Sequence, residues 1–423
     1  MRPAVAEALE DVSIVALDAR GEGVADNGSA VSGALPGERA RVRRFGKRAE
    51  LVEILSANPD RAQAICRWYG RCGGCAAQHM SQGLYREWKR GLVVEALRRE
   101  GIEGQVGELV DAHGAGRRRA TFHARFPQGA PEEVGFMRAR SHEIVSIDDC
   151  PLFSPTMAVA IPAARALARD LRGLGKPLDI GVAATLEGLD VDIRGAGPLG
   201  LAEIRKLART AEALDLARLS NHGAAMVERR PPCAAFGGTL VKLPPGGFLQ
   251  ATEAGEERLA NFAEEALVAS RRMADLFCGA GAFAFRLARA REVLAADIDP
   301  DAILALKRAA TAQGFNRLTV DARDLYRRPL SAAELSSFDA VLMDPPRAGA
   351  REQARELALS ALPLVVSISC DPASFARDAR AIIEGGFRIE RLIPLDQFRF
   401  SPHVEIAAVF RRPRTKKRAR RLL

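Results

Sequence analysis

Four apolar runs in the second half of the chain each end at a polar residue that a glycine or proline follows within a few positions. These residues are Asp275, Asp297, Asp344 and Cys370. Short apolar runs bounded by turn residues predict buried strands, and helical patterns lie between them. The alternation favours a doubly wound α/β sheet from about residue 236. Because ligands bind outside the carboxyl ends of the strands in such a sheet, we expect these side chains along one functional rim.

Cys370 is the strongest candidate for chemistry in the chain. It ends the run LPLVVSISC, and Asp371-Pro372 stops the strand at once. An isolated cysteine is more often a buried, inert packing residue. Here a second run, FDAVLMDPPR, brings the carboxylate of Asp344 to an equivalent strand end. A thiol and a carboxylate on one rim favour a nucleophile at Cys370.

The segment ADLFCGAGAF predicts a strand, a glycine turn and the start of a helix. Gly279–Ala284 matches the G-x-G-x-x-A dinucleotide fingerprint, so a nicotinamide-dependent oxidoreductase is one alternative. Asp275 argues against it, because an acid just before the loop repels a pyrophosphate and attracts a cation. Asp297, about twenty residues further on, suits ribose hydroxyls. S-adenosylmethionine, an adenosine with a cationic sulfonium, fits these features better.

Three of the seven cysteines fall within ten residues, at Cys66, Cys72 and Cys75, and Cys150 offers a fourth thiol. We expect a cytoplasmic chain without a signal peptide, which disfavours a disulfide framework. The spacing therefore indicates a metal site. Four thiolates suit either zinc or an iron–sulfur cluster, and the spacing by itself leaves both open.

Composition places the chain among ordered proteins with a nucleic-acid partner. Hydrophobic residues make up 48%, which excludes a disordered chain, and no apolar run reaches the length of a membrane span. Net charge is +9, and the segment from Arg411 onward holds eight Lys or Arg. Removing these eight from the 62 basic residues leaves 54 against 53 acids. We expect this tail to bind phosphates, with residues 41–48 and 117–119 as further basic surface sites. We also expect a monomer that does not bind membranes.

The order of these patterns predicts three parts. Residues 1–58 read as short alternating strands, typical of a small β-barrel. Residues 59–235 form a central domain that includes the cysteines and a helix at 82–100, with Leu84, Trp88, Leu92 and Val93 on one face. Residues 236–423 form the doubly wound domain with the basic tail from 411.

Five segments together resemble the RNA 5-methyluridine methyltransferase family. They are GGFLQATEAGEERL, DLFCGAGAF, MDPPRAG, SISCDPASFARD and HVEIAAVFRR. The resemblance covers most of the chain. It implies that Cys370 attacks carbon 6 of uracil and that Glu405 serves as the base. It further implies that S-adenosylmethionine is bound by four residues, namely Gln250, Phe277, Asp297 and Asp344. The chain departs from the family pattern with Asp371 for Asn, Ala282 for Asn and Asp297 for Glu.

A cluster-bearing branch of this family has the same C-x5-C-G-G-C element and a later cysteine. The resemblance implies a 4Fe–4S cluster on Cys66, Cys72, Cys75 and Cys150, a barrel of the OB-like TRAM type, and 23S ribosomal RNA as substrate. Transfer RNA is the nearer alternative substrate. A non-catalytic RNA-binding factor of the same fold is a more distant one.

Overall fold

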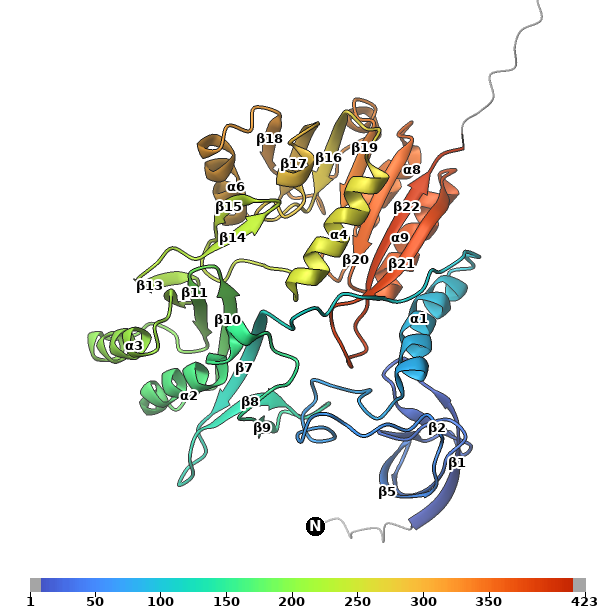
Figure 1. Ribbon diagram of the computed structural model, residues 1–423, viewed down its shortest axis with the longest axis vertical. Helices are drawn as coiled ribbons and strands as arrows, with labels where there is room; N and C mark the ends of the chain where they lie inside the picture. Colours follow the sequence, from blue (N-terminus) through green and yellow to red (C-terminus); the bar gives the residue numbers. More distant parts are fainter. Residues whose placement is uncertain (1–8, 414–423) are drawn as a thin grey trace, which may run out of the picture.

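The computed structural model describes residues 9–413 and contains three sheets and one hairpin. Figure 1 shows a barrel, a central sheet and a large α/β domain arranged around the middle of the molecule. Of the basic tail predicted from 411, residues 414–423 lie outside the described residues, whereas Arg411 pairs with Glu390. In residues 9–413, no helix is both long and apolar enough to cross a membrane.

The amino-terminal strands form a closed barrel in the order β1-β2-β3-β5-β4, as the sequence predicted. The strands are β1 (Leu9–Leu17), β2 (Gly23–Ala25), β3 (Ala30–Val31), β4 (Arg39–Phe45) and β5 (Arg48–Ser56). Alternate residues such as Val12 and Ile14 point inward and make its core. The arginines of β4 and β5 do not form a free basic surface. Those of the run 41–48 lie against acids of the barrel in ion pairs that include Arg41–Asp11, Arg41–Glu53, Arg43–Glu50, Arg44–Glu10 and Arg48–Glu22. The predicted phosphate-binding role of this run is therefore weakened by local pairing.

The central sheet has the order β13-β12-β11-β10-β7-β8-β9. Its strands are β7 (Arg119–Arg125), β8 (Glu133–Met137), β9 (Ile144–Ser146), β10 (Leu178–Thr185), β11 (Gly188–Arg194), β12 (Arg218–Asn221) and β13 (Ala224–Glu228). Helices α2 (Ala160–Asp170) and α3 (Leu201–Ala213) pack against it and share its apolar core. Two 3-10 turns, η1 (Pro155–Met157) and η2 (Arg172–Leu174), flank α2. The hairpin of β14 (Cys233–Phe236) and β15 (Thr239–Lys242) leads from this sheet to the α/β domain.

The α/β domain is built on a sheet in the order β18-β17-β16-β19-β20-β22-β21-β6. Its strands are β6 (Val110–Asp111), β16 (Arg272–Leu276), β17 (Glu292–Asp297), β18 (Leu318–Ala322), β19 (Ala340–Met343), β20 (Leu364–Ser369), β21 (Arg388–Asp396) and β22 (Glu405–Arg411). The strands from β16 to β20 are parallel, and β22 runs antiparallel to both β20 and β21. Separate apolar cores cover the two faces, which confirms the predicted doubly wound methyltransferase-type sheet.

The helices divide between the two faces of this sheet. They are α4 (Glu253–Ala266), α5 (Ala284–Leu287), α6 (Pro300–Ala312), α7 (Ala332–Leu335), α8 (Arg351–Leu359) and α9 (Pro372–Glu384). Buried residues of α4, α5 and α6 belong to one core, and those of α7, α8 and α9 to the other. Ile303, Leu306 and Ala310 are buried on α6.

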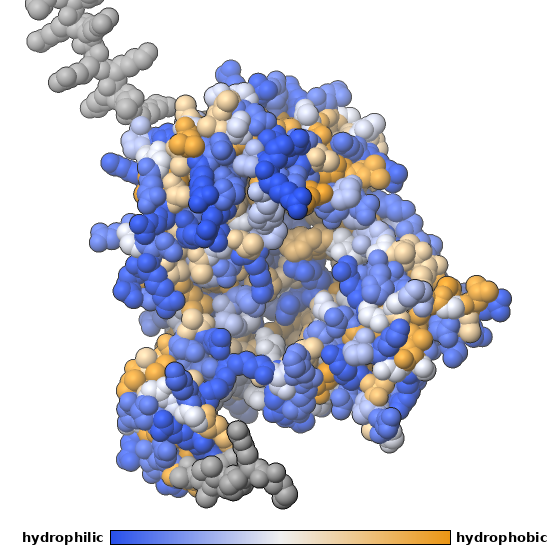
Figure 2. All heavy atoms as spheres, turned by 180° about the vertical axis from the view of Figure 1, so that it is seen from behind, coloured by the Kyte–Doolittle hydropathy of each residue, from blue (hydrophilic) through white to orange (hydrophobic). Residues whose placement is uncertain are grey.

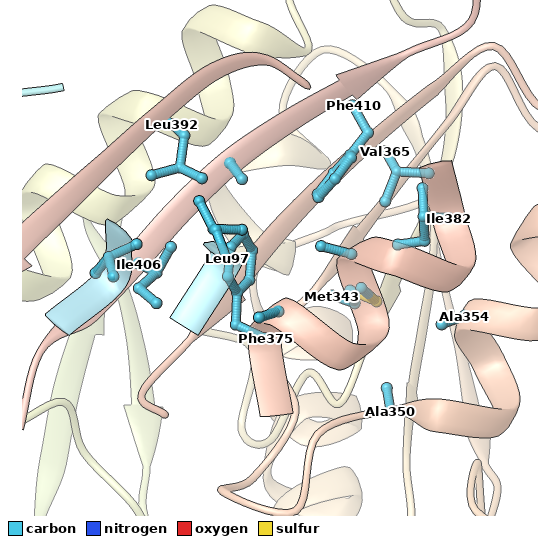
Figure 3. Close-up of a cluster of buried hydrophobic side chains, with 14 of the residues drawn as sticks. Leu97, Met343, Ala350, Ala354, Val365, Phe375, Ile382, Leu392, Ile406 and Phe410 are labelled. Atoms are coloured by element: carbon cyan, nitrogen blue, oxygen red, sulfur yellow. The ribbon is translucent and has the colours of Figure 1, made fainter. Parts of the chain in front are cut away.

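Helix α1 (Gln82–Arg99) comes from the predicted central domain but packs on the α/β domain. Figure 3 shows Leu97 of α1 among the side chains of α9, β21 and β22. Strand β6, which follows α1, pairs with β21 at the edge of the large sheet. The predicted boundaries after residues 58 and 235 stay predictions. The buried face of α1 contains the expected Trp88 and Val93 but also a charged residue, Lys89.

Candidate active site

The predicted functional residues meet at one edge of the large sheet. Asp275 and Asp297 lie within the last residues of β16 and β17, while Asp344 and Cys370 directly follow β19 and β20. A cavity of about 1130 Å³ opens at this edge, and Figure 2 shows the molecule hollowed between its three parts. Its walls include all six residues expected to act in catalysis or cofactor binding: Gln250, Phe277, Asp297, Asp344, Cys370 and Glu405.

A chain of hydrogen bonds joins the expected base to the expected cofactor residues. Gln397 Nε2 donates to Glu405 Oε1 at 2.8 Å and to Gln250 Oε1 at 3.0 Å. Gln250 Nε2 donates in turn to Asp344 Oδ2 at 3.2 Å. Sequence reasoning missed Gln397, which sits in an irregular segment with no motif of its own. The two amides fix the orientation of both carboxyl groups.

Burial raises the pKa of three acids at this site. It raises the pKa of Glu405 to about 7 and that of Asp275 to about 8, and it raises the pKa of Asp344 well above its usual value. Both carboxyl oxygens of Asp275 are buried without a hydrogen-bond partner in the described structure. Buried carboxyl groups of this kind favour a cationic ligand, because a positive charge would stabilise their ionised forms.

Burial also raises the pKa of the Cys370 thiol, to about 11, and the nearby Glu405 and Asp344 act in the same direction. The guanidinium of Arg347 opposes them. A thiolate is the reactive form, so Arg347 favours the nucleophile. Arg347 also lies 3.2 Å from His403 Nε2.

The glycine loop after β16 has the shape that a ligand-binding turn requires. Gly281 has φ +97°, and a side chain there would come within 2.8 Å of the Phe285 ring. The backbone N–H of Gly279 donates to Asp297 Oδ2 at 2.9 Å, which ties the loop to the next strand end. Phe277 adopts φ +61°, a left-handed conformation that is costly for a residue other than glycine. Such strain concentrates at ligand sites.

The triplet 117–119, expected as a further basic surface site, lies beside the cavity, and its phosphate-binding role stays a prediction. All three side chains are partly buried. Arg117 and Arg119 line the cavity, and each has a buried Nε without a partner. The Arg119 guanidinium lies 4.5 Å from the Phe248 ring centre. Arg118 donates to the Gln250 carbonyl at 3.0 Å and pairs with Glu256 at 2.6 Å. Arg117, just before β7, and Arg119, its first residue, therefore bring two cations to the cavity wall.

The four cysteines predicted as metal ligands line a further stretch of the same cavity. Burial raises the pKa of Cys75 to about 12, and repulsion from Cys150, Cys72 and Cys66 adds to the shift. The thiols are therefore electrostatic neighbours. In residues 9–413, however, no group of three or more Cys, His, Asp or Glu side chains is arranged to hold a metal ion.

Comparisons with known proteins show which families this chain is similar to. A model of the tRNA (uracil-5-)-methyltransferase family matches residues 240–413. Uncharacterized RNA methyltransferases of Agrobacterium fabrum and Caulobacter vibrioides are each 40% identical and cover 95% and 96% of this chain, and 99% and 100% of their own lengths. The 23S rRNA (uracil(1939)-C(5))-methyltransferase RlmD of Pseudomonas fluorescens is 35% identical over 90% of this chain and 88% of its own. The chain belongs to the RNA (uracil-5-)-methyltransferase family.

The fold agrees with this assignment along the whole chain. The crystal structure of the Pyrococcus abyssi tRNA (uracil-54, C5)-methyltransferase, in complex with S-adenosyl-L-homocysteine, superposes with a TM-score of 0.71. It covers 95% of this chain and 100% of its own at 22% identity. Membership confirms the predicted family and an RNA methyltransferase activity, and it removes the oxidoreductase and the non-catalytic alternatives. The roles of individual residues stay predictions.

Proposed function

We propose that this RNA methyltransferase transfers a methyl group from S-adenosylmethionine to carbon 5 of a uridine in ribosomal RNA through a covalent Cys370–uracil adduct. One observation carries the proposal. The thiol of Cys370 and the buried carboxyl of Glu405 line the same cavity and interact electrostatically, within reach of the Gln250–Asp344 pair.

The thiol is needed because carbon 5 of uracil is too weak a nucleophile to take a methyl group directly. The Cys370 thiol gives its proton to solvent, and the thiolate adds to carbon 6. The electron pair of the carbon 5–carbon 6 double bond then moves toward carbon 5 and the carbon-4 oxygen as an enolate. Carbon 5 then attacks the sulfonium methyl, and the donor leaves as a neutral thioether. Covalent catalysis of this kind divides one difficult step into easier ones. Arg347 and Arg119 place positive charge near the thiolate and the enolate.

The base completes the reaction. Glu405 removes the remaining proton from carbon 5, and the electrons of that bond re-form the carbon 5–carbon 6 double bond as the Cys370 sulfur leaves. A catalytic base works best with a pKa near the operating pH. The pKa of Glu405, about 7, meets that condition. Gln397 holds the carboxyl by one oxygen, which leaves the other for the proton.

We further propose that Cys66, Cys72, Cys75 and Cys150 hold a 4Fe–4S cluster. The donor set fits in kind, because four thiolates are the usual ligands of such a cluster and these four thiols line the same cavity. A zinc ion is the second candidate for the same donors. The cluster would have a structural role, shaping the cavity wall opposite the catalytic rim.

Ribosomal RNA is the preferred substrate because RlmD, named for 23S rRNA, matches nearly the whole chain. Transfer RNA, for which the Pyrococcus abyssi enzyme is named, is the alternative. Mass mapping of 5-methyluridine in total RNA from cells with and without the gene separates the two.

We also propose that the protein acts in the cytoplasm as a monomer, with RNA as its partner.

The covalent step can be tested with RNA that carries 5-fluorouridine at the target. Fluorine cannot leave as a proton does, so the wild-type enzyme should stay bound through Cys370 in an adduct that survives denaturation. Cys370→Ala should form no adduct while keeping its affinity for S-adenosylmethionine, and Cys233→Ala is the matched thiol control. An adduct mapped to any other cysteine would remove Cys370 from the mechanism.

The base can be tested with ordinary RNA. Glu405→Gln keeps the shape of the side chain and an oxygen that can accept from Gln397, so the variant should fold. It should add to uracil and methylate it but accumulate the methylated adduct. Normal turnover by Glu405→Gln would show that another group removes the proton.

A further inference from the structure

The connection between β21 and β22 positions the proposed base. Residues 397–404, here called the strap, form turns and bends and lead directly into Glu405. The strap carries Gln397, which binds Glu405, and His403, which contacts Arg347. Because the strap leads into Glu405 and carries its hydrogen-bond partner, a shift of the strap would displace the base.

Lys89 on helix α1 is aimed at this strap. Its side chain is fully buried, and its ammonium makes three hydrogen bonds. They go to Asp396 Oδ1 at 2.7 Å, to the Phe398 carbonyl at 3.1 Å and to the His403 carbonyl. An ammonium has three donors, so each is used, and all three bind the strap or the residue before it.

Tyr85, one turn earlier on α1, adds two more contacts to the same segment. Its hydroxyl donates to Asp396 Oδ2 at 2.5 Å and accepts from the Phe400 N–H at 2.8 Å. Phe400 has φ +61°, a conformation that persists only when its surroundings hold it. The N–H groups of Ala76 and Ala77 both donate to the Phe400 carbonyl, at 2.7 and 3.1 Å. The strap is thus fixed from outside its own sheet.

Simple packing does not account for Lys89. Removing a charge from water is costly, and an apolar side chain of similar volume often stabilises a buried site equally well. The ammonium supplies what an apolar residue cannot, namely three directed contacts that bring backbone carbonyls from both ends of the strap to one point. Its charge also acts on Glu405, in the same sense as that of Arg347.

We propose that Lys89 is a positioning residue for the removal of the carbon-5 proton. By binding Asp396, Phe398 and His403 it holds the strap, and through the strap it holds Glu405 against the methylated adduct. The inference rests on the proposed role of Glu405 as base. It assigns to helix α1 a part in one chemical step rather than in stability alone.

Single-turnover assays on ordinary RNA test this assignment in the full-length protein. Lys89→Met should bind S-adenosylmethionine normally and form the methylated adduct, but release RNA about ten to a hundred times more slowly, because small displacements of a catalytic group have effects of this size. Tyr85→Phe leaves no unpaired charge and should show the same accumulation to a smaller extent. If Lys89→Met does not fold, Tyr85→Phe decides the question.

Arg90→Met is the matched control. Arg90 also donates from α1 to backbone carbonyls, but to those of Val106 and Gly107 rather than to the strap. It should release RNA at the wild-type rate. Equal slowing of methylation and release in Lys89→Met, or release as fast as in wild type, would overturn the proposal. If Glu405→Gln itself accumulates no adduct, the assignment of the base fails first, and the two failures are distinguished.

Discussion

Changing the pH should separate the two proton transfers of the proposed mechanism. Burial raises the pKa of Glu405 to about 7, so its reactive, deprotonated form is lost as the pH falls through that value. Going from about pH 8 to about pH 6 lowers the deprotonated fraction from roughly nine tenths to roughly one tenth. Release of methylated RNA from the adduct should therefore slow about tenfold and should level off above neutral pH.

The addition step should respond differently over the same range. The pKa of Cys370 is raised to about 11, chiefly by burial. At every pH well below that value, the thiolate fraction grows about tenfold per pH unit. Adduct formation with 5-fluorouridine RNA, which needs no proton abstraction from carbon 5, should follow this slope from about pH 6 to about pH 9 without a plateau.

Rapid-quench measurements on the two RNAs give the two profiles separately. Adduct formation that levels off near neutral pH would mean that the thiol is already ionised there and that Arg347 outweighs burial. Release that keeps rising above pH 8 would exclude a base with a pKa near 7. In Glu405→Gln, the rate of RNA release should no longer rise to a plateau above neutral pH. That result would assign the pH dependence of release to this carboxyl.

Two further predictions concern stability and metal content. Arg218 is buried, binds Asp190 at 2.6 Å and donates to the Leu243 and Pro244 carbonyls at 2.9 Å, so Arg218→Met should lower the free energy of unfolding by about 3–5 kcal/mol. Chemical denaturation measures this, and Arg218→Met with Asp190→Leu should recover part of the loss, whereas no recovery would contradict the ion-pair account. Anaerobically purified protein should contain about four irons per chain and lose them when Cys75 is replaced. Colourless protein with one zinc would assign the thiols to zinc instead.

The sheet and its rim could be predicted because their physical causes are local. A run such as LPLVVSISC followed by Asp371-Pro372 determines both the strand and its end, and parallel strands bring their carboxyl ends to one edge. The observed positions of Asp344 and Cys370 follow from these two facts. The barrel was predictable for the same reason, since short alternating strands and glycine turns leave few other arrangements.

The contacts made across long stretches of sequence could not be predicted. Lys89 lies on a helix whose periodicity suggested an apolar face, yet its partner Asp396 is 307 residues away. Gln397 has no motif, and it becomes significant only when β21 and β22 pair beside Gln250. The triplet 117–119 suggested a surface patch, because a sequence shows that side chains are charged but not where they point in the fold. Its role depends on how β7 faces the α/β domain.

The proposed base depends on the α/β domain, the central sheet and helix α1. The α/β domain supplies the Glu405 carboxyl, and burial raises its pKa. Four groups lower its pKa: the hydrogen bond from Gln397 and the charges of Arg119, Lys89 and Arg347. Arg119 comes from the central sheet and Lys89 from helix α1, so two of the three cations lie outside residues 236–423. Docking of those parts therefore brings two cations that lower the pKa of the proposed base. We expect an isolated α/β domain to retain the rim and the thiol but to lose two of the three cations that act on Glu405.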